Sequence, residues 1–103
     1  MVLYLIATLC LLSSFILFDI LIWLEYTRHK HAWLVDGEAV GFFYSPVKAT
    51  VARANAGMKL SLSWLFTTPS WIRCVKSYWY LLVAMRACTL AWNVLVILIV
   101  SQL

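Results

Sequence analysis

Charged residues are scarce in this sequence of 103 residues. They make up 12% of the chain, against 65% apolar residues, and the mean hydropathy is +0.93. Soluble domains contain roughly 25% charged and about 45–50% apolar residues. A soluble domain of this length buries only about 60–70% of its surface, so it could not hide so many apolar side chains. The excess must face lipid or protein, which predicts a single membrane domain over residues 1–103.

Motifs for catalysis or cofactor binding are also missing. The sequence has no G-x-S-x-G, no H-E-x-x-H and no Gly-rich phosphate loop, and its acidic residues form no pair at catalytic spacing. Cys10, Cys74 and Cys88 form no C-x-x-C motif, so we expect buried free thiols. His29 and His31 would point to different faces of a helix, and no third ligand accompanies them. We therefore expect no enzyme activity, no metal site and no cofactor of the chain's own.

Residues 2–24 form the first long apolar segment. They contain one charge, Asp19, and span the ~20 residues that a helix needs to cross a bilayer. The segment lacks the basic n-region and the A-x-A-like cleavage site of a secretory signal. It is predicted to be a transmembrane helix.

Residues 77–101 form the second predicted span, in which Arg86 is the one charged residue. The aromatic residues 78–80 at its start are typical of the interfacial belt of a membrane protein. Thr68 and Pro69 have the residue types of a helix N-cap and first position. We expect the helix to start there and to continue through Arg73 and Lys76 into the span.

The connection over residues 25–76 holds seven of the eight basic residues. A loop this short obeys the positive-inside rule, which places the connection on the cytoplasmic side and both termini on the outer side. Anionic phospholipids, not nucleic acids, are the expected partners of this charge. The expected headgroup contacts are Arg28, Lys30, Lys48, Lys59, Arg73 and Lys76.

The connection is itself expected to contain turns and a helix. Residues 33–45 have the composition of turns, and Ser45-Pro46 favours a helix start. Apolar residues then recur at helical spacing over residues 46–66, which predicts an amphipathic helix at the membrane interface. The alternative, a third span, would place three cations in the bilayer at a cost of roughly 2.5–3.5 kcal/mol each. The apolar stripe consists of Val47, Val51, Ala54, Met58, Leu62 and Leu65.

Asp19 and Arg86 are the charges inside the two spans. In an antiparallel hairpin both fall in the same leaflet, within about one helical turn in depth at 1.5 Å per residue. An ion pair between them is the simplest arrangement in which neither charge meets lipid alone. Pairing with another subunit, snorkelling of Arg86 and protonation of Asp19 are the alternatives.

Small residues line the opposite side of each span from its charge. They permit close helix approach where lipid provides no hydrophobic drive, so each span has two sides suited to protein contact. A lone hairpin uses one side of each helix, which indicates neighbours in a larger complex. The predicted packing residues are Ala7, Cys10, Ser14, Ala84, Cys88 and Ala91.

Two local stretches and the overall layout carry a family resemblance. V-D-G-E-A-V-G-F-F at 35–43 is similar to a V-D-G-G-x-F-F stretch, and Trp71-Ile72-Arg73-Cys74 precedes the second span. With two spans around a polar middle, the chain resembles universal stress protein B, a small bacterial inner-membrane family. The resemblance implies an integral membrane protein of the bacterial inner membrane and leaves its biochemical role open.

Taken together, these features predict an all-α protein with two antiparallel transmembrane helices joined by a cytoplasmic-side amphipathic helix. The favoured function is an accessory or structural subunit of a larger membrane complex of respiratory, photosynthetic or membrane-oxygenase type, with bound lipids. A stand-alone stress-adaptation protein and a small transporter or proton-conducting oligomer are the alternatives.

Overall fold

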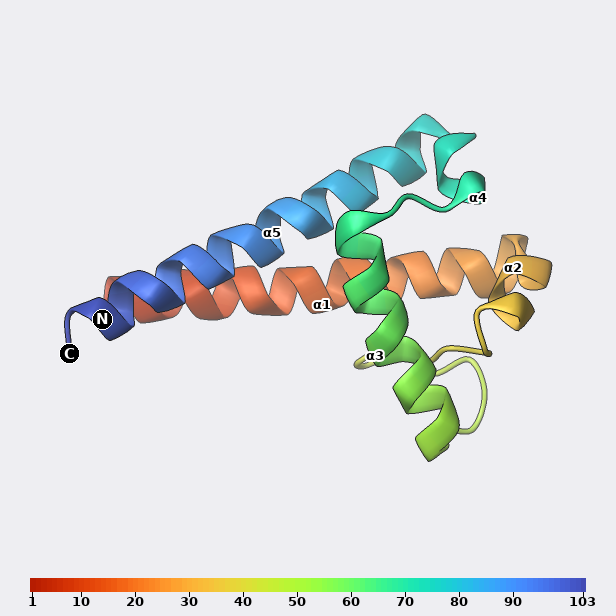
Figure 1. The fold of residues 1–103 in the computed structure, drawn as a ribbon, viewed down its shortest axis with the longest axis horizontal. Helices are drawn as coiled ribbons and strands as arrows, with labels where there is room; N and C mark the ends of the chain where they lie inside the picture. Colours follow the sequence, from red (N-terminus) through yellow and green to blue (C-terminus); the bar gives the residue numbers. More distant parts are fainter.

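The computed structural model describes all 103 residues and contains helices but no strand (Figure 1). The predicted all-helical fold class is confirmed. Two long apolar helices lie at the two ends of the sequence, and three shorter helices lie between them. The elements are α1 (Val2–Arg28), α2 (Lys30–Val35), α3 (Val51–Phe66), α4 (Ser70–Arg73) and α5 (Lys76–Ser101).

The long helices α1 and α5 pack side by side. The hydroxyls of Ser14 and Thr89 share a hydrogen bond of 2.7 Å, and the rings of His29 and Tyr78 lie 5.6 Å apart at their centroids. Residue numbers along α1 thus rise where those along α5 fall, and the two termini lie together at one end (Figure 1). Both helices are long and apolar enough to cross a membrane.

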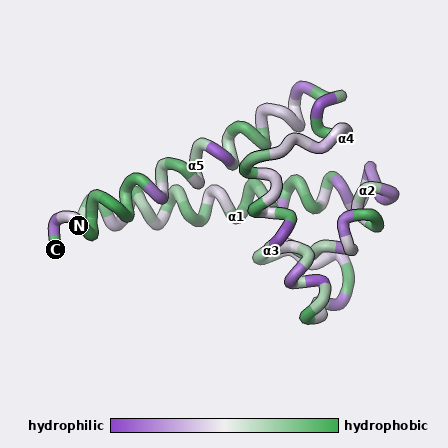
Figure 2. The backbone as a smooth tube through the Cα atoms, viewed as in Figure 1, coloured by the Kyte–Doolittle hydropathy of each residue, from purple (hydrophilic) through white to green (hydrophobic).

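The shorter elements gather at the other end and form a cap over the C-terminal part of α1 (Figure 1). The main hydrophobic core lies where this cap meets α1 and α5. Figure 2 shows hydrophilic residues concentrated in the cap, whereas the ends of α1 and α5 near the termini are mainly hydrophobic. The largest fully buried side chains of the core are Phe18, Leu21, Ile22, Trp64, Ile72, Leu82 and Met85.

Helix α3 starts later than the predicted position at Pro46. Its first residue is Val51, and the hydroxyl of the extended residue Thr50 accepts a hydrogen bond from the N–H of Arg53 at 3.2 Å. This contact satisfies one of the free N–H groups of the first turn. Thr50 is therefore the N-cap, and the proline signal four residues earlier does not start the helix.

The buried face of α3 also differs from the predicted apolar stripe. Gly57, Leu60 and Trp64 are buried, whereas Met58 and Leu62 of the stripe are exposed. A Cβ at position 57 would collide with the backbone carbonyl of Val40. Glycine therefore lets the α2–α3 loop pack directly against the helix, and this close approach selects the buried face.

The chain between α3 and α5 is broken where a continuous helix is predicted. Pro69 is the N-cap of α4, and Val75 has an extended backbone (φ −130°, ψ 121°) that separates α4 from α5. This break turns Trp71 and Ile72 into the core. The structure also makes residues 30–35 a short helix, so the predicted turn region begins at Asp36.

Candidate functional site

Asp19 anchors the loop that leads into α3. Its carboxylate accepts the backbone N–H of Phe42 on Oδ1 at 2.7 Å, and those of Phe43 and Tyr44 on Oδ2 at 2.7 and 3.0 Å. Successive backbone N–H groups of this kind form a concave anion-binding surface. Asp19 lies within α1 and is buried beneath the loop. Its negative charge is thus satisfied by backbone dipoles instead of a cation.

The residues around this anchor fix the loop geometry. Gly41 donates its N–H to the carbonyl of Tyr44 at 2.9 Å, and a Cβ on Gly41 would collide with the Asp19 carboxylate. The ring of Phe42 stacks on Phe15 at 4.1 Å between centroids. Offset aromatic stacking contributes about 0.5–1.5 kcal/mol beyond simple burial. Hydrogen bonds and ring packing therefore hold the same turn.

Arg86 anchors the other end of α3. Its Nε donates to the carbonyl of Trp64 at 2.8 Å, and one terminal nitrogen donates to the carbonyl of Thr67 at 2.9 Å and to the hydroxyl of Thr68 at 3.1 Å. The last carbonyls of a helix lack intrahelical partners and carry the negative end of its dipole. The guanidinium thus supplies both a charge and a set of donors that this helix end requires.

The predicted Asp19–Arg86 ion pair is not present. The single ion pair of the structure joins Arg53 to Glu38 at 3.0 Å. Asp19 and Arg86 lie at similar depths on α1 and α5, but α3 and its flanking loops provide nearer partners. Backbone N–H groups there donate to Asp19, and backbone carbonyls there accept from Arg86. No periodic pattern of side chains in the sequence indicates which backbone groups will be these partners. The glycine-aromatic run 41–44 is the one local signal, since it permits a tight turn.

The predicted small-residue faces lie at or near the contact between α1 and α5. Ala7 and Ser14 are buried, and Cys10 and Cys88 are half-buried. Ala84 and Ala91 are also half-buried on α5. Of these positions, Ser14 joins α1 to α5 directly through its hydrogen bond with Thr89.

The six basic residues predicted at lipid headgroups have exposed side chains, and four of them, Lys30, Lys48, Lys59 and Arg73, lie in the cap. The other two lie on the long helices beside the cap, where Arg28 ends α1 and Lys76 begins α5. The ammonium of Lys30 lies 4.8 Å from the centroid of the Tyr26 ring, a cation–π contact. His29 packs its ring on Trp71 at 4.9 Å. No group of three or more His, Cys, Asp or Glu side chains has a geometry that could hold a metal ion.

Glu25 is a buried carboxyl that the sequence did not single out. It lies on α1 with no solvent exposure, and neither of its oxygens accepts a hydrogen bond. Its polar neighbours are the carboxyl of Asp36, at the end of α2, and the indole N–H of Trp71 in α4. That indole N–H also lacks an acceptor. Buried polar groups without partners are rare in folded proteins, so this cluster is a candidate site.

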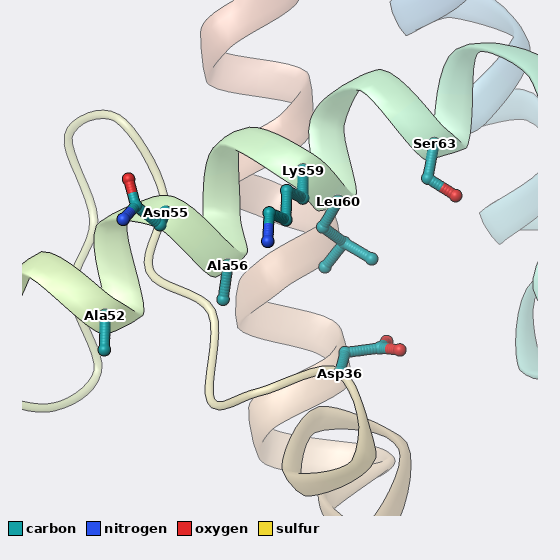
Figure 3. Close-up of a pocket in the computed structure, with 7 residues that line it drawn as sticks. All are labelled: Asp36, Ala52, Asn55, Ala56, Lys59, Leu60 and Ser63. Carbon is teal, nitrogen blue, oxygen red and sulfur yellow. The ribbon is translucent and has the colours of Figure 1, made fainter.

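Two clefts open beside Asp36. One, of about 470 Å³, lies against the polar side of α3, and Figure 3 shows Asp36 and Lys59 on its walls with the Asp36 carboxylate directed away from the Lys59 ammonium. The other, of about 410 Å³, lies between α2, α3 and α4 and is lined by Asp36, Trp64 and Trp71 among others. Asp36, Leu60 and Ser63 line both clefts, which are therefore neighbours.

A third cleft, of about 410 Å³, is mainly apolar and lies where α3 crosses α1 and α5. Met58 and Leu62 of α3 face Leu11 of α1 and Trp92 of α5 across it. The apolar stripe predicted for α3 thus lines this cleft through three of its members, Met58, Leu62 and Leu65.

A scan against protein-family models and searches of the curated proteins and of the solved structures found no match to this chain.

Proposed function

We propose that this chain is a small integral membrane protein in which α1 and α5 cross the bilayer as an antiparallel pair, and that it serves as an accessory subunit of a larger membrane complex. The 27 residues of α1 extend about 40 Å at 1.5 Å per residue. Either helix is thus long enough to cross a hydrocarbon core of about 30 Å, and the rest of each helix would lie inside the cap.

The position of α3 supports an interfacial role for this helix. Its exposed apolar residues Met58 and Leu62 are on the side that faces the terminal halves of α1 and α5, whereas Asn55 and Lys59 line the polar cleft on the other side. An amphipathic helix with this division lies at the headgroup boundary, with its apolar side toward the acyl chains. The cap would then rest on one membrane surface.

The distribution of charge supports an orientation. The exposed basic residues are in and beside the cap, and both termini lie at the far end of the long helices (Figure 1). The positive-inside rule then places the cap on the cytoplasmic side of a bacterial inner membrane, or its organellar equivalent, next to anionic phospholipids.

The observation that carries the subunit proposal is the exposed polar residue Asn93 on the apolar half of α5. Its amide nitrogen donates to the carbonyl of Thr89 at 2.8 Å, and its oxygen accepts no hydrogen bond within the chain. Around it, Leu90 and Ile97 are 66% and 67% exposed. Polar side chains at this depth usually hydrogen-bond across a helix interface, because lipid offers no partner. A helix of another subunit would satisfy Asn93.

In this proposal the two long helices fill a groove between larger subunits of a respiratory, photosynthetic or membrane-oxygenase type of complex. The charges of Asp19 and Arg86 do not join the spans but hold the cap in place beneath them. The resemblance to universal stress protein B stays a prediction, and it favours a chain that acts alone.

Purification in mild detergent distinguishes these possibilities. The subunit proposal expects the chain to migrate with a large complex at fixed stoichiometry, and Asn93→Leu to reduce the bound fraction. Leu98→Ile, at an exposed apolar position of the same helix, is the matched control and should leave that fraction unchanged. Migration of the wild-type chain as a monomer or small homo-oligomer would contradict the proposal.

A further inference from the structure

Glu25 is a carboxyl buried without a partner for a negative charge. Its side chain has no solvent exposure, and neither of its oxygens accepts a hydrogen bond. An isolated carboxylate is so costly to bury that such a group takes up a proton instead. The site of Glu25, enclosed between α1 and the cap, therefore favours the neutral acid.

The carboxyl of Asp36 gives this acid a partner. Asp36 follows the last residue of α2, lies within hydrogen-bond reach of Glu25 and is half-buried at the surface of the cap. It forms no ion pair. Two adjacent carboxylates repel each other, whereas one proton between them makes a short acid–carboxylate hydrogen bond. A protonated Glu25 can thus donate its O–H to Asp36, which joins α1 to the end of α2.

The balance of forces on Glu25 keeps this proton in place. Burial, followed by the contact with Asp36, raises the pKa of Glu25 to about 9. The indole N–H of Trp71, in α4, is the one neighbour that favours the charged form, and its effect is the smaller one. The neutral acid is therefore the main form at the pH of a cell.

No cation of the surrounding elements acts on this pair. On α1 itself, Arg28 is exposed, and the ring of His29 packs on Trp71 and Tyr78. Asp36 is the one charged side chain that affects the pKa of Glu25. The other titratable residues of the packed elements are exposed, namely Lys30 and His31 of α2, Lys59 of α3, Arg73 of α4 and Lys76 of α5.

We propose that Glu25 and Asp36 form a pH-sensitive latch, in which the neutral acid of Glu25 holds the end of α2 against α1 and loss of its proton to water at alkaline pH releases α2. After this loss the two carboxylates repel each other, and no cation compensates them. The end of α2 can move because this helix has six residues and Asp36 already reaches the surface. The latch does not depend on whether the chain joins a larger complex.

The contribution of Glu25 to stability falls with rising pH. Its pKa is about 9 in the folded chain against an ordinary value of 4.5, so the folded chain holds the extra proton between these values. This contribution is fully present below the ordinary pKa and is lost as the pH rises toward the folded one. The unfolding constant of the wild type should thus rise by about tenfold per pH unit in this range relative to that of Glu25→Gln.

Spin labels measure the release of α2 directly. One label is placed at Val35→Cys, an exposed position of α2, and the other at the exposed native Cys74, with Cys10 and Cys88 replaced by alanine. In detergent micelles the distance between the labels should change as the pH passes the pKa of Glu25. No change in the distance would overturn the proposal.

Two variants assign this transition to Glu25. Glu25→Gln keeps an N–H donor for Asp36 but has no proton to lose, so the distance between the labels should stay constant. Glu38→Gln removes the surface partner of Arg53 and should keep the wild-type transition as the matched control. A transition of equal size in Glu25→Gln would contradict the latch.

A second measurement covers the case in which Glu25→Gln does not fold. Carboxyls with ordinary pKa values of about 4 are ionised at neutral pH, so the wild type should show one carboxylic-acid C=O band in its infrared spectrum. This band should disappear at alkaline pH, and Asp36→Asn, which removes the adjacent negative charge, should move its loss to lower pH. Absence of the acid band at neutral pH, or an unchanged midpoint in Asp36→Asn, would overturn the proposal.

Discussion

Asp19 and Arg86 hold opposite ends of one segment without pairing with each other. Asp19, on α1, binds three N–H groups of the loop that leads into α3. Arg86, on α5, binds two carbonyls and a hydroxyl at the C-terminal end of α3. Each long helix thus contributes one charge to the attachment of the cap, and the two charges together fix α3 across the pair.

Asp19→Asn tests the first attachment. The amide lacks the negative charge and presents an NH₂ group to backbone donors, so the loop should detach. Hydrogen bonds to charged groups contribute about 1.5–3 kcal/mol each, so the free energy of unfolding should fall by roughly 3 kcal/mol. Unfolding of the purified chain in mixed micelles, followed by circular dichroism, measures this loss.

The control for this variant is Glu38→Gln. Its carboxylate belongs to a surface ion pair with Arg53, in which the side chains are 37% and 29% exposed. Exposed pairs of this kind contribute about 0–1 kcal/mol. Equal losses in the two variants would contradict an anchoring role for Asp19.

Arg86→Lys tests the second attachment. Lysine keeps the positive charge but cannot present the fixed set of donors that reaches Trp64, Thr67 and Thr68 together. The free energy of unfolding should fall by about 1.5–3 kcal/mol, the value of one hydrogen bond to a charged group. Proteolysis should then cut the α3–α4 turn before any site in α5. Wild-type stability in Arg86→Lys would show that the charge alone is sufficient.

An exchange of the two charges tests whether they act separately. The double variant Asp19→Arg with Arg86→Asp would restore a direct ion pair if the two side chains were partners. Since each binds backbone groups that suit only its own charge, the double variant should be no more stable than either single variant. Recovery of stability beyond the less stable single variant would indicate a direct pair.

Gly57→Ala tests the packing of α3 on the α2–α3 loop. The added methyl group would collide with the carbonyl of Val40, which is backbone and cannot rotate away. Overpacking of this kind costs typically about 1–3 kcal/mol, despite the higher helix propensity of alanine. Asn55→Ala, at an exposed position of the same helix, should change the free energy of unfolding by less than about 0.5 kcal/mol.

The sequence predicts the two long helices well because the high apolar content of these segments is enough to identify them. The bounds of the spans differ by few residues: α1 extends to Arg28 where the predicted span ends at residue 24, and α5 begins at Lys76, one residue before the predicted span. The helix start predicted at Pro69 was wrong, because Val75 breaks the chain between α4 and α5. Helix α3 was predicted in place but not in orientation. Apolar periodicity identifies a helix, yet the small residue Gly57 determines which face approaches the loop.

The partners of the buried charges could not be predicted in the same way. Asp19 and Arg86 bind backbone atoms, and backbone donors and acceptors are present at nearly every residue of a sequence. Their selection depends on where the α2–α3 loop and the end of α3 lie in three dimensions. Glu25 escaped notice for a related reason: it follows the predicted span, and only the cap buries it.

Labelling from each side of the membrane tests the central claim that α1 and α5 cross the bilayer with the cap on one surface. Cys74 is exposed in the turn before α5, and Ser101 ends that helix. In sealed vesicles of known orientation, a membrane-impermeant maleimide should label a variant with Cys74 alone from the cytoplasmic side. A variant with Ser101→Cys as its one cysteine should react only from the opposite side. Labelling of both positions from the same side would contradict the account.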